Sequence, residues 1–287
     1  MRSFSVFVLV VVATVLAPLA VASTWVSARV DDRREYVDTV APLADDPGVR
    51  QVMADAAAAG AVKALQERIP VGLPAAVTDW ADAAARKVVD SPDFPEFWRT
   101  ANEDVHRQVL AVLKDPDADT SGSITVDAAP LLAQVLLSLE ERGIPVALLP
   151  RLPLEVRVVE RAKVAEGGPV YRATHGASRW LPPLWLGLVL LAVLVASGWR
   201  GRLRTAGLAL LGLALGAGLV LLAVDPVTDL LVDRAEVGDQ PLVRIMLDAV
   251  LGSLTPWARA FLLAIPAGVV LLAGSLWPAR ERFDATP

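Results

Sequence analysis

The chain has 287 residues, of which 54% are hydrophobic, and its mean hydropathy is +0.49. That hydrophobicity is too high for an ordinary soluble domain, yet 21% of the residues are charged, so a polar domain must accompany membrane-spanning segments. The net charge of −5 and the lack of a basic stripe exclude nucleic acid as an expected partner. The absence of cysteine excludes disulfide bonds, thiolate metal sites and a cysteine nucleophile.

The N-terminal segment, residues 1–28, has an apolar run from Phe4 to Val21 behind a single basic residue, Arg2. The run is longer than the ~7–15-residue core of a secretory signal, which favours a retained transmembrane anchor. Ala20-Val21-Ala22 also resembles a signal-peptidase site, so a cleaved signal stays open as the alternative. Both interpretations place the next segment outside the cytoplasm.

Residues 29–179 form the expected extracytoplasmic domain, which is mostly helical. Asp46-Pro47-Gly48 and Ser91-Pro92-Asp93 each precede apolar residues at helical spacing, and we expect three helices that pack on one another. The third carries the most regular apolar stripe in the chain, formed by Phe94, Trp98, Ala101, Val105, Val109 and Val112. We interpret Trp80 and Trp98 as core residues rather than as ligand-stacking ones.

Two short alternating runs later in this domain, Ser123–Val126 and Leu154–Val158, predict half-buried strands. Between them, Asp127 is expected to cap a helix with Pro130 in its first turn and Gly143 just past its end. A strand, a helix and a strand in this order favour a parallel pair with a right-handed crossover. Two strands are not stable alone, so we expect them to pack on the helices.

Residues 180–224 are predicted to form a transmembrane hairpin. Its two apolar runs, Pro183–Trp199 and Thr205–Val224, contain no Asp, Glu, Lys or Arg, and each matches the ~17–25 residues of a bilayer-spanning helix. The link at residues 200–204 carries three arginines. Because short Arg-rich loops stay cytoplasmic, we expect this turn to face the cytoplasm.

After the hairpin, residues 225–256 are predicted as an acidic extracytoplasmic segment, residues 257–277 as a fourth span and residues 278–287 as a cytoplasmic tail. Helical spacing in Val243–Leu254 predicts a helix along the membrane surface. A kink is expected in the last span near Pro266-Ala267-Gly268.

Glycines in the second half of the hairpin include a GxxxG step at Gly212 and Gly216, which lets two helix backbones approach closely. We interpret it as packing within the chain's own helices, with dimerisation or partner docking as the alternative. The span interiors hold no central ionisable residue, which argues against transport of ions or protons.

The stretch Tyr36–Ala44 (YVDTVAPLA), followed by Asp46-Pro47-Gly48-Val49, resembles a family of actinobacterial integral membrane proteins. Ser91–Leu110 is similar to that family's second recurring stretch, and so is the layout of an anchor, an external domain and three closing spans. The resemblance implies a four-span membrane protein and no established activity. It also implies a continuous helix entering the membrane, where this chain has Gly167-Gly168-Pro169 instead.

The best chemical candidate is the segment Asp115–Ile124. Read from Asp117, it places oxygen-bearing side chains and Gly122 as a calcium-binding EF loop does. Position 12 is Ala128 instead of a bidentate acidic residue, so we interpret the segment as a polar turn, with weak calcium binding as the alternative.

The two histidines give no catalytic arrangement. His106 lies off the apolar stripe and is expected to face solvent or cap a helix, while His175 stands near the membrane surface without an evident partner in the sequence. No Ser–His–Asp order is identifiable. We therefore predict no catalytic, cofactor-binding or metal-binding residue, no cofactor and no enzymatic activity.

These patterns predict a mainly α membrane protein with four transmembrane helices and an extracytoplasmic, mostly helical domain that carries a small two-stranded β element. The expected function is non-enzymatic: the external domain binds or scaffolds other components of the cell envelope. The alternative is an extracytoplasmic sensor that signals through a separate partner. Expected partners are the lipid bilayer and an envelope protein or a second copy of the chain.

Overall fold

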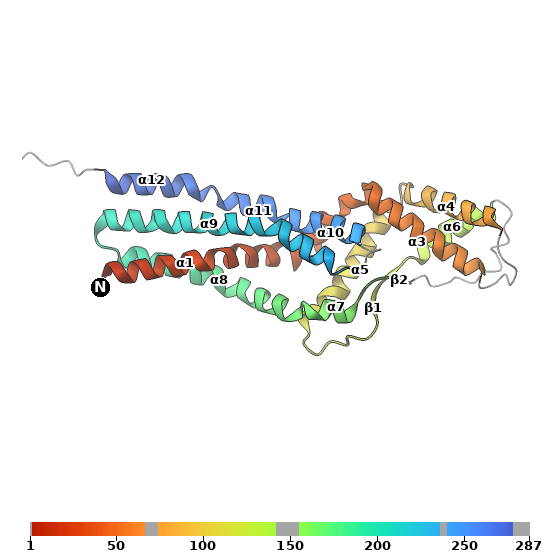
Figure 1. Cartoon of the computed structure of the whole chain (residues 1–287), viewed down its shortest axis with the longest axis horizontal. Coiled ribbons are helices and arrows are strands. Elements are labelled where there is room, and N and C mark those ends of the chain that lie inside the picture. The colour runs from red at the N-terminus through yellow and green to blue at the C-terminus, as the bar shows by residue number, and fades with distance from the viewer. Residues whose placement is uncertain (1, 67–73, 142–154, 236–239, 278–287) are drawn as a thin grey trace, which may run out of the picture. The chain divides into compact units, whose positions relative to one another are not determined.

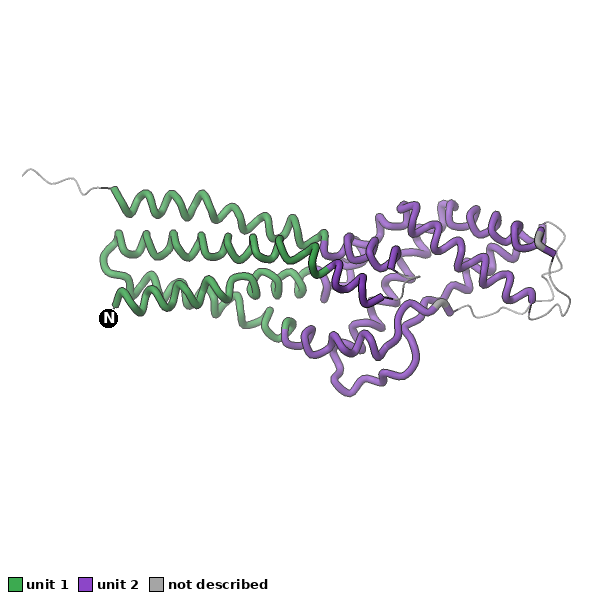
Figure 2. The backbone as a smooth tube through the Cα atoms, viewed as in Figure 1, with its two compact units in different colours: residues 1–28, 174–227, 252–287 green, residues 29–173, 228–251 purple. Residues whose placement is uncertain are grey.

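The computed structural model of the chain describes residues 2–66, 74–141, 155–235 and 240–277. It divides into two compact units (Figure 2). The membrane unit comprises residues 1–28, 174–227 and 252–287. The helical domain comprises residues 29–173 and 228–251. The expected tail at 278–287 and the expected helix end at Gly143 lie outside the described residues.

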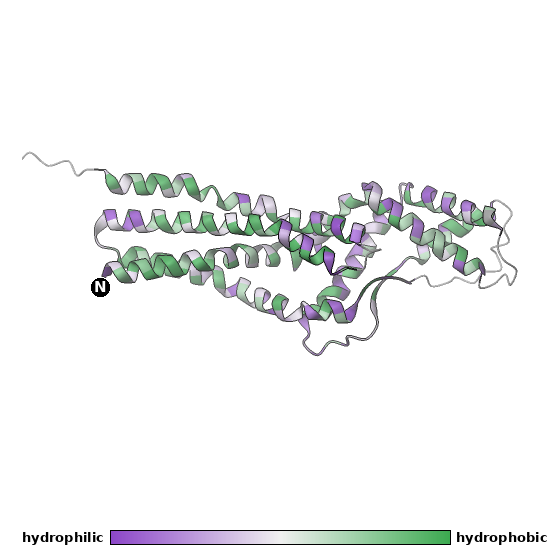
Figure 3. Ribbon diagram, in the orientation of Figure 1, coloured by the Kyte–Doolittle hydropathy of each residue, from purple (hydrophilic) through white to green (hydrophobic). Residues whose placement is uncertain are grey.

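Among the described residues, four helical runs are long and apolar enough to cross a membrane, as the green ribbons of Figure 3 show. They consist of α1 (Arg2–Trp25) with the π-helix η1 (Val26–Val30), α8 (Gly168–Val195), α9 (Gly198–Asp233), and α10 (Gln240–Gly252) with α11 (Leu254–Phe261) and α12 (Ala264–Leu276). These runs indicate a multi-pass membrane protein, in agreement with the sequence.

The hairpin turn lies earlier than the sequence predicted. Only Ala196 and Ser197 separate α8 from α9, and the arginines expected in the loop lie in the first turns of α9. Gly198 adopts a φ of +64°, a left-handed conformation that glycine enters without steric cost. The chain reverses there and resumes a helix at once, because arginine and leucine are good helix formers.

The last span breaks at Leu262 and Leu263, between α11 and α12, a few residues before the expected site. Pro266 has no backbone N–H to donate to the carbonyl of Leu262, and its ring clashes with that carbonyl in a regular helix. The helix therefore ends and restarts, which leaves Pro266 in the first turn of α12, where proline is tolerated.

Helix α1 packs directly on α9 through the GxxxG step. A Cβ atom added at Gly212 would clash with Oγ1 of Thr14, and one at Gly216 would lie 2.6 Å from Cβ of Ala17 and 2.8 Å from N of Pro18. Both glycines therefore pack against another helix of the same chain. The structure supports the interpretation of this step as internal packing.

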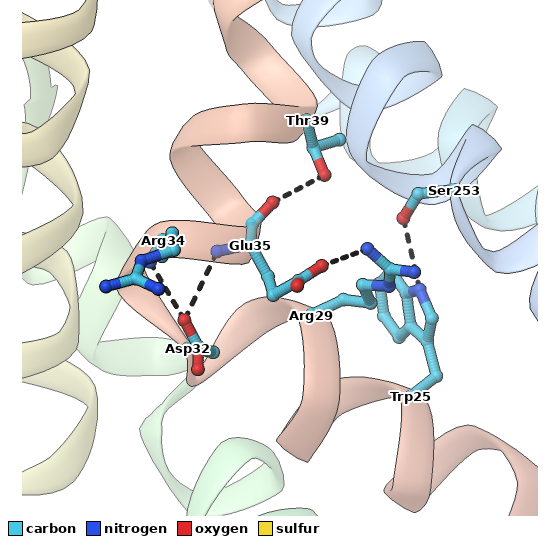
Figure 4. Close-up of polar contacts among 7 residues, drawn as sticks. All are labelled: Trp25, Arg29, Asp32, Arg34, Glu35, Thr39 and Ser253. Atoms are coloured by element: carbon cyan, nitrogen blue, oxygen red, sulfur yellow. Dashed lines mark hydrogen bonds and ion pairs between the residues drawn. The ribbon is translucent and has the colours of Figure 1, made fainter.

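Three further contacts hold the membrane unit together. On α9, a Cβ at Gly207 would lie 2.8 Å from the carbonyl oxygen of Gly268 in α12. Trp185 of α8 donates a hydrogen bond from Nε1 to the carbonyl of Ala13 in α1, at 2.9 Å. Trp25 Nε1, at the end of α1, donates to Oγ of Ser253 at 3.1 Å (Figure 4).

Small side chains fill the interior of the membrane unit and large ones cover its outside. Buried positions include Ala13, Ala17, Ala192, Ala209 and Ala217, whereas exposed ones include Phe4, Val15, Leu190, Leu222 and Val270. Lipid tails are as apolar as leucine, so helices in a bilayer gain by close backbone packing and not by burying large side chains. This distribution is typical of a lipid environment.

The helical domain contains the remaining described elements. In chain order they are α2 (Arg33–Val40), the 3₁₀-helix η2 (Ala41–Asp45), α3 (Pro47–Gln66), α4 (Ala75–Val89), α5 (Phe94–Lys114), β1 (Ser123–Asp127), α6 (Ala129–Glu140), β2 (Glu155–Glu160) and α7 (Arg161–Glu166). The predicted start of α3 at Asp46 is confirmed by its cap, whereas the N-cap of α6 is Ala128, one residue after the expected Asp127, whose side chain forms a turn instead. Asp46 Oδ1 accepts from the backbone N–H of Gly48 at 2.8 Å, and Asp127 Oδ1 accepts from that of Ala129 at 2.9 Å.

The core of the domain lies between α3, α4 and α6 and extends to Phe94 and Trp98 of α5. Helix α10 packs its apolar side chains Leu242, Ile245 and Met246 against this core. The fourth run therefore extends into the helical domain through α10, whereas its part in the membrane unit is α11 and α12. The expected position of α10 along the membrane surface stays a prediction. An apolar helix face can be buried by protein as well as by lipid, and helical spacing alone does not distinguish the two.

The two strands pair antiparallel, with Ser123 opposite Glu160, so the expected parallel pair is wrong. The crossover rule requires a helix that packs on the sheet, whereas α6 packs on α3 and α4. As expected, the sheet leans on a helix: Gln108 of α5 donates from Nε2 to the carbonyl of Thr125 in β1, at 2.9 Å.

Helices α7 and α8 meet at the glycine pair noted in the sequence. Helix α7 ends at Glu166, Gly167 follows as its cap, and α8 then runs without a break from Gly168 through Pro182 and Pro183 to Val195. The interruption is therefore a single helix boundary.

Candidate functional site

A line of buried side chains on α5, within the helical domain, includes the polar residues Asn102 and His106. The buried positions Phe94, Trp98, Asn102, His106 and Leu110 follow one another at four-residue intervals. The expected stripe ran through the apolar neighbours Ala101, Val105 and Val109, which are only partly buried. The prediction from the sequence treated polar residues as exposed. It therefore placed the buried face of the helix at the apolar neighbours instead of at Asn102 and His106.

His106 is buried, so the expectation of a solvent-facing histidine is wrong. Its ring stacks on that of Tyr36 in α2, with ring centroids 4.3 Å apart and planes 17° from parallel. Its Nε2 lies 2.7 Å from the carbonyl oxygen of Val30, the last residue of the π-helix η1. Since a carbonyl only accepts hydrogen bonds, we assign the ring proton to Nε2.

Both rings of this pair are neutral at pH 7. Burial lowers the pKa of His106, and the nearby charges of Lys114 and Arg33 lower it further, while the hydrogen bond to Val30 and the charge of Asp31 act in the opposite direction. Burial raises the pKa of Tyr36 to about 12. The stack therefore holds no charge that would need a buried counterion.

Hydrogen bonds near this pair hold α5 against the end of α2 and connect Tyr171 with the chain just before α2. Trp98 Nε1 donates to the carbonyl of Val40 at 2.8 Å, and Asn102 Nδ2 donates to the carbonyl of Trp98 at 2.9 Å. The hydroxyl of Tyr171 donates to Asp31. Backbone carbonyls accept from Trp98 and Asn102 and a carboxylate accepts from Tyr171, so these polar groups are satisfied, as a folded core requires. The arrangement supports a structural role.

The start of α2 is fixed by local polar contacts (Figure 4). Asp32 Oδ1 accepts hydrogen bonds from the backbone N–H groups of Arg34 at 2.9 Å and Glu35 at 3.2 Å. The Glu35 carboxylate also pairs with Arg29. A cap of this kind typically stabilises a helix by ~1 kcal/mol. It holds α2, and with it Tyr36, in position.

The segment considered for calcium folds as a polar turn. Asp115 Oδ1 accepts from the N–H of Asp117 and Asp119 Oδ1 from that of Ser121, each at 2.9 Å, and Gly122 has a φ of +75°. The hydrogen bonds from Ser121 lower the pKa of Asp119. The part of the chain that the structure describes holds no group of three or more acidic or histidine side chains able to bind a metal.

A shallow, solvent-open depression of about 620 Å³ lies beside the two strands. Its lining is polar and mixed in charge, with Glu155, Arg157, Glu160 and Arg161 among the contributors. Neither histidine lines it: His106 is buried in the α5 line, and His175 is exposed on α8.

Comparisons with known proteins give no assignment. No protein-family model matches the chain, and no curated protein or solved structure shows a significant match to it. The resemblance to actinobacterial four-span membrane proteins stays a prediction.

The buried His106 is expected to make the stability of the protein fall on acidification. Its pKa in the folded chain lies below the ordinary value of 6.5, so the unfolded chain binds more protons in the interval between the two values. The free energy of unfolding then decreases as the pH falls through 6.5, and continues to decrease until folded His106 is itself protonated.

Melting temperatures of full-length protein and His106→Gln, measured from about pH 7.5 to about pH 5, test this expectation. The melting temperature of the variant should decrease less steeply with falling pH than that of the unchanged protein. Both proteins contain the same carboxylates, so the difference between the two slopes reports His106. Equal slopes would contradict it.

Proposed function

We propose that this chain is a non-enzymatic protein of the cell envelope whose helical domain lies outside the cytoplasm and binds or scaffolds other envelope components. The observation that carries the proposal is that α10, which precedes the membrane-unit part of the fourth run (α11 and α12), packs on the core built by residues 29–173. In a chain with four crossings, the first and third connections emerge on the same side of the membrane. The two connections form one domain there.

The charge pattern supports the outside location of that domain. The connection between the second and third spans is only Ala196–Ser197, and Arg200, Arg202 and Arg204 follow it directly. Short arginine-rich connections remain in the cytoplasm, so this turn is the inside end. The membrane therefore anchors a domain on one side with little described chain on the other. The domain is the part that meets partners.

Single-cysteine labelling tests the location, because the chain has no cysteine of its own. Asp79 in α4 and Ser197 in the turn are both exposed, which makes them suitable positions. In intact cells, a membrane-impermeant maleimide is expected to label Asp79→Cys, and to label Ser197→Cys only after permeabilisation. The opposite pattern would invert the proposed topology.

The binding function is tested by cross-linking tagged full-length protein in cells, followed by mild detergent purification and mass spectrometry. A reproducible envelope protein attached to the helical domain is the expected result. Recovery of the chain alone would contradict scaffolding of other proteins. The intact mass of the same sample tests whether α1 is retained, as its packing on Gly212 and Gly216 favours.

A sensor that acts through a separate partner is the second candidate. It is favoured by the neutral His106–Tyr36 stack, which contacts the π-helix immediately after the first span. Single π-turns often occur at functional sites. A ligand that binds the folded domain would raise the melting temperature of the full-length protein, whereas a scaffold needs no such ligand.

A further inference from the structure

One end of the membrane unit gathers arginine side chains from two helices. Helices α1 and α9 run parallel, since Thr14 lies against Gly212 and Ala17 against Gly216. Arg2 lies twelve residues before Thr14 in α1, and Arg200 lies twelve residues before Gly212 in α9. The N-termini of both helices therefore lie at the same end (Figure 1).

Helix α12 runs antiparallel to α9 and reaches the same end. Gly268 lies against Gly207, and Arg200 donates a hydrogen bond from Nη2 to the carbonyl of Trp277 at 2.7 Å. We call this surface the arginine end; it consists of Arg2, Arg200, Arg202, Arg204, Trp199 and Trp277.

The positive charge of the arginine end has no counter-charge among the described residues around it. Residues 2–8, 190–205 and 270–277 contain no Asp or Glu. Arg202 and Arg204 are exposed, and the ion pairs found between described residues do not include them. The N-terminal dipole of α9 adds further positive potential.

The opposite end of the membrane unit differs in this respect. The segments toward that end, residues 174–180, 220–227 and 254–262, contain the acidic Asp225 as well as the basic Arg179 and Arg259. The described segments of the arginine end thus hold only basic charged residues, whereas those toward the opposite end hold charges of both signs. An anion from outside the chain is the partner that this charge distribution fits.

The tryptophans place these guanidinium groups at the depth of lipid headgroups. Trp199 and Trp277 are 62% and 71% exposed, although tryptophan is usually well buried in folded proteins. Exposed tryptophans at helix ends are typical of the membrane–water interface. The charge-free run Thr205–Val224 begins one residue after Arg204 and, as a helix, extends about 30 Å, the thickness of the hydrocarbon core.

We propose that the arginine end binds anionic phospholipid headgroups of the leaflet that it faces. A guanidinium group matches the geometry of a phosphate and can donate two hydrogen bonds to it. Bound lipid phosphates would supply the missing negative charge beside α9. Because the bound lipids contact both α9 and the end of α12, they stabilise the packing of the membrane unit.

The test uses full-length protein purified in a neutral detergent, with phosphatidylglycerol or phosphatidylcholine added. Phosphatidylglycerol is expected to raise the melting temperature, and native mass spectrometry is expected to show it retained in preference to phosphatidylcholine. In Arg202→Gln/Arg204→Gln, its retention should fall about tenfold or more. Arg259→Gln is the matched control at the opposite end and should retain the lipid as the unchanged protein does.

Three results would overturn the proposal. The first is equal retention of the two lipids by the unchanged protein, and the second is equal retention of phosphatidylglycerol by the double variant and the unchanged protein. The third is an equal rise in melting temperature with inorganic phosphate at the same concentration, which would indicate binding of a free anion instead of a lipid. If the double variant is less stable, native mass spectrometry of its folded fraction still compares lipid retention between folded proteins.

Discussion

Gly216→Ala is expected to lower the melting temperature of the full-length protein, whereas Gly218→Ala, two residues along the same helix, should leave it unchanged or raise it slightly. A Cβ at Gly216 would lie 2.6 Å from Cβ of Ala17 and 2.8 Å from the backbone N of Pro18. Neither atom belongs to a flexible side chain that can move aside. Overpacking of this kind costs about 1–3 kcal/mol, so α1 must shift away from α9.

Gly218 is the matched control because a Cβ there meets nothing within 4 Å. Alanine is also favoured over glycine in a helix by about 1 kcal/mol. Thermal unfolding in detergent, followed for the two variants side by side, measures the difference. If both substitutions gave the same melting temperature, the close packing of α1 on α9 through Gly216 would be wrong.

Trp98→Ala is expected to destabilise the helical domain by about 3–5 kcal/mol, the usual cost of removing a buried aromatic side chain. Trp98 is only 5% exposed, and its ring lies 6.4 Å from that of Phe94. Its removal also leaves the carbonyl of Val40 without the Nε1 donor. An unsatisfied buried acceptor adds to the loss.

Trp80→Ala provides the comparison for this loss. Trp80 is 38% exposed in the structure, although the sequence placed it in the core, so its replacement should cost about 1 kcal/mol or less. Resistance of the helical domain to protease, measured in the full-length protein, reports both changes. Similar protease resistance of the two variants would contradict the burial that distinguishes the two tryptophans.

Features set by a few neighbouring residues could be predicted from the sequence. The start of α3 depends on Asp46, whose carboxylate binds a backbone N–H group two residues ahead. The apolar length of the spans is likewise a local property. These features need no knowledge of the rest of the fold.

The buried polar residues of α5 could not be predicted in this way. His106 is buried because Val30 and Tyr36, about 70 residues earlier in the chain, supply an acceptor and a stacking ring. The pairing direction of the strands was missed because it depends on where α6 packs. The sequence does contain a four-residue spacing from Phe94 and Trp98 through Asn102 to His106. A search for apolar residues alone misses this spacing, because Asn102 and His106 are polar.

The burial of α10 against α3 has a consequence for biogenesis. Gly48 and Ile245 approach each other closely across about 200 residues of chain. During synthesis, α3 therefore emerges long before the helix that covers part of its surface. The apolar face around Gly48 stays uncovered until the second and third spans have been inserted and α10 has followed them. A nascent chain at that stage exposes a surface suited to chaperones, and the domain is completed only after the third span has been made, before α11 and α12 follow.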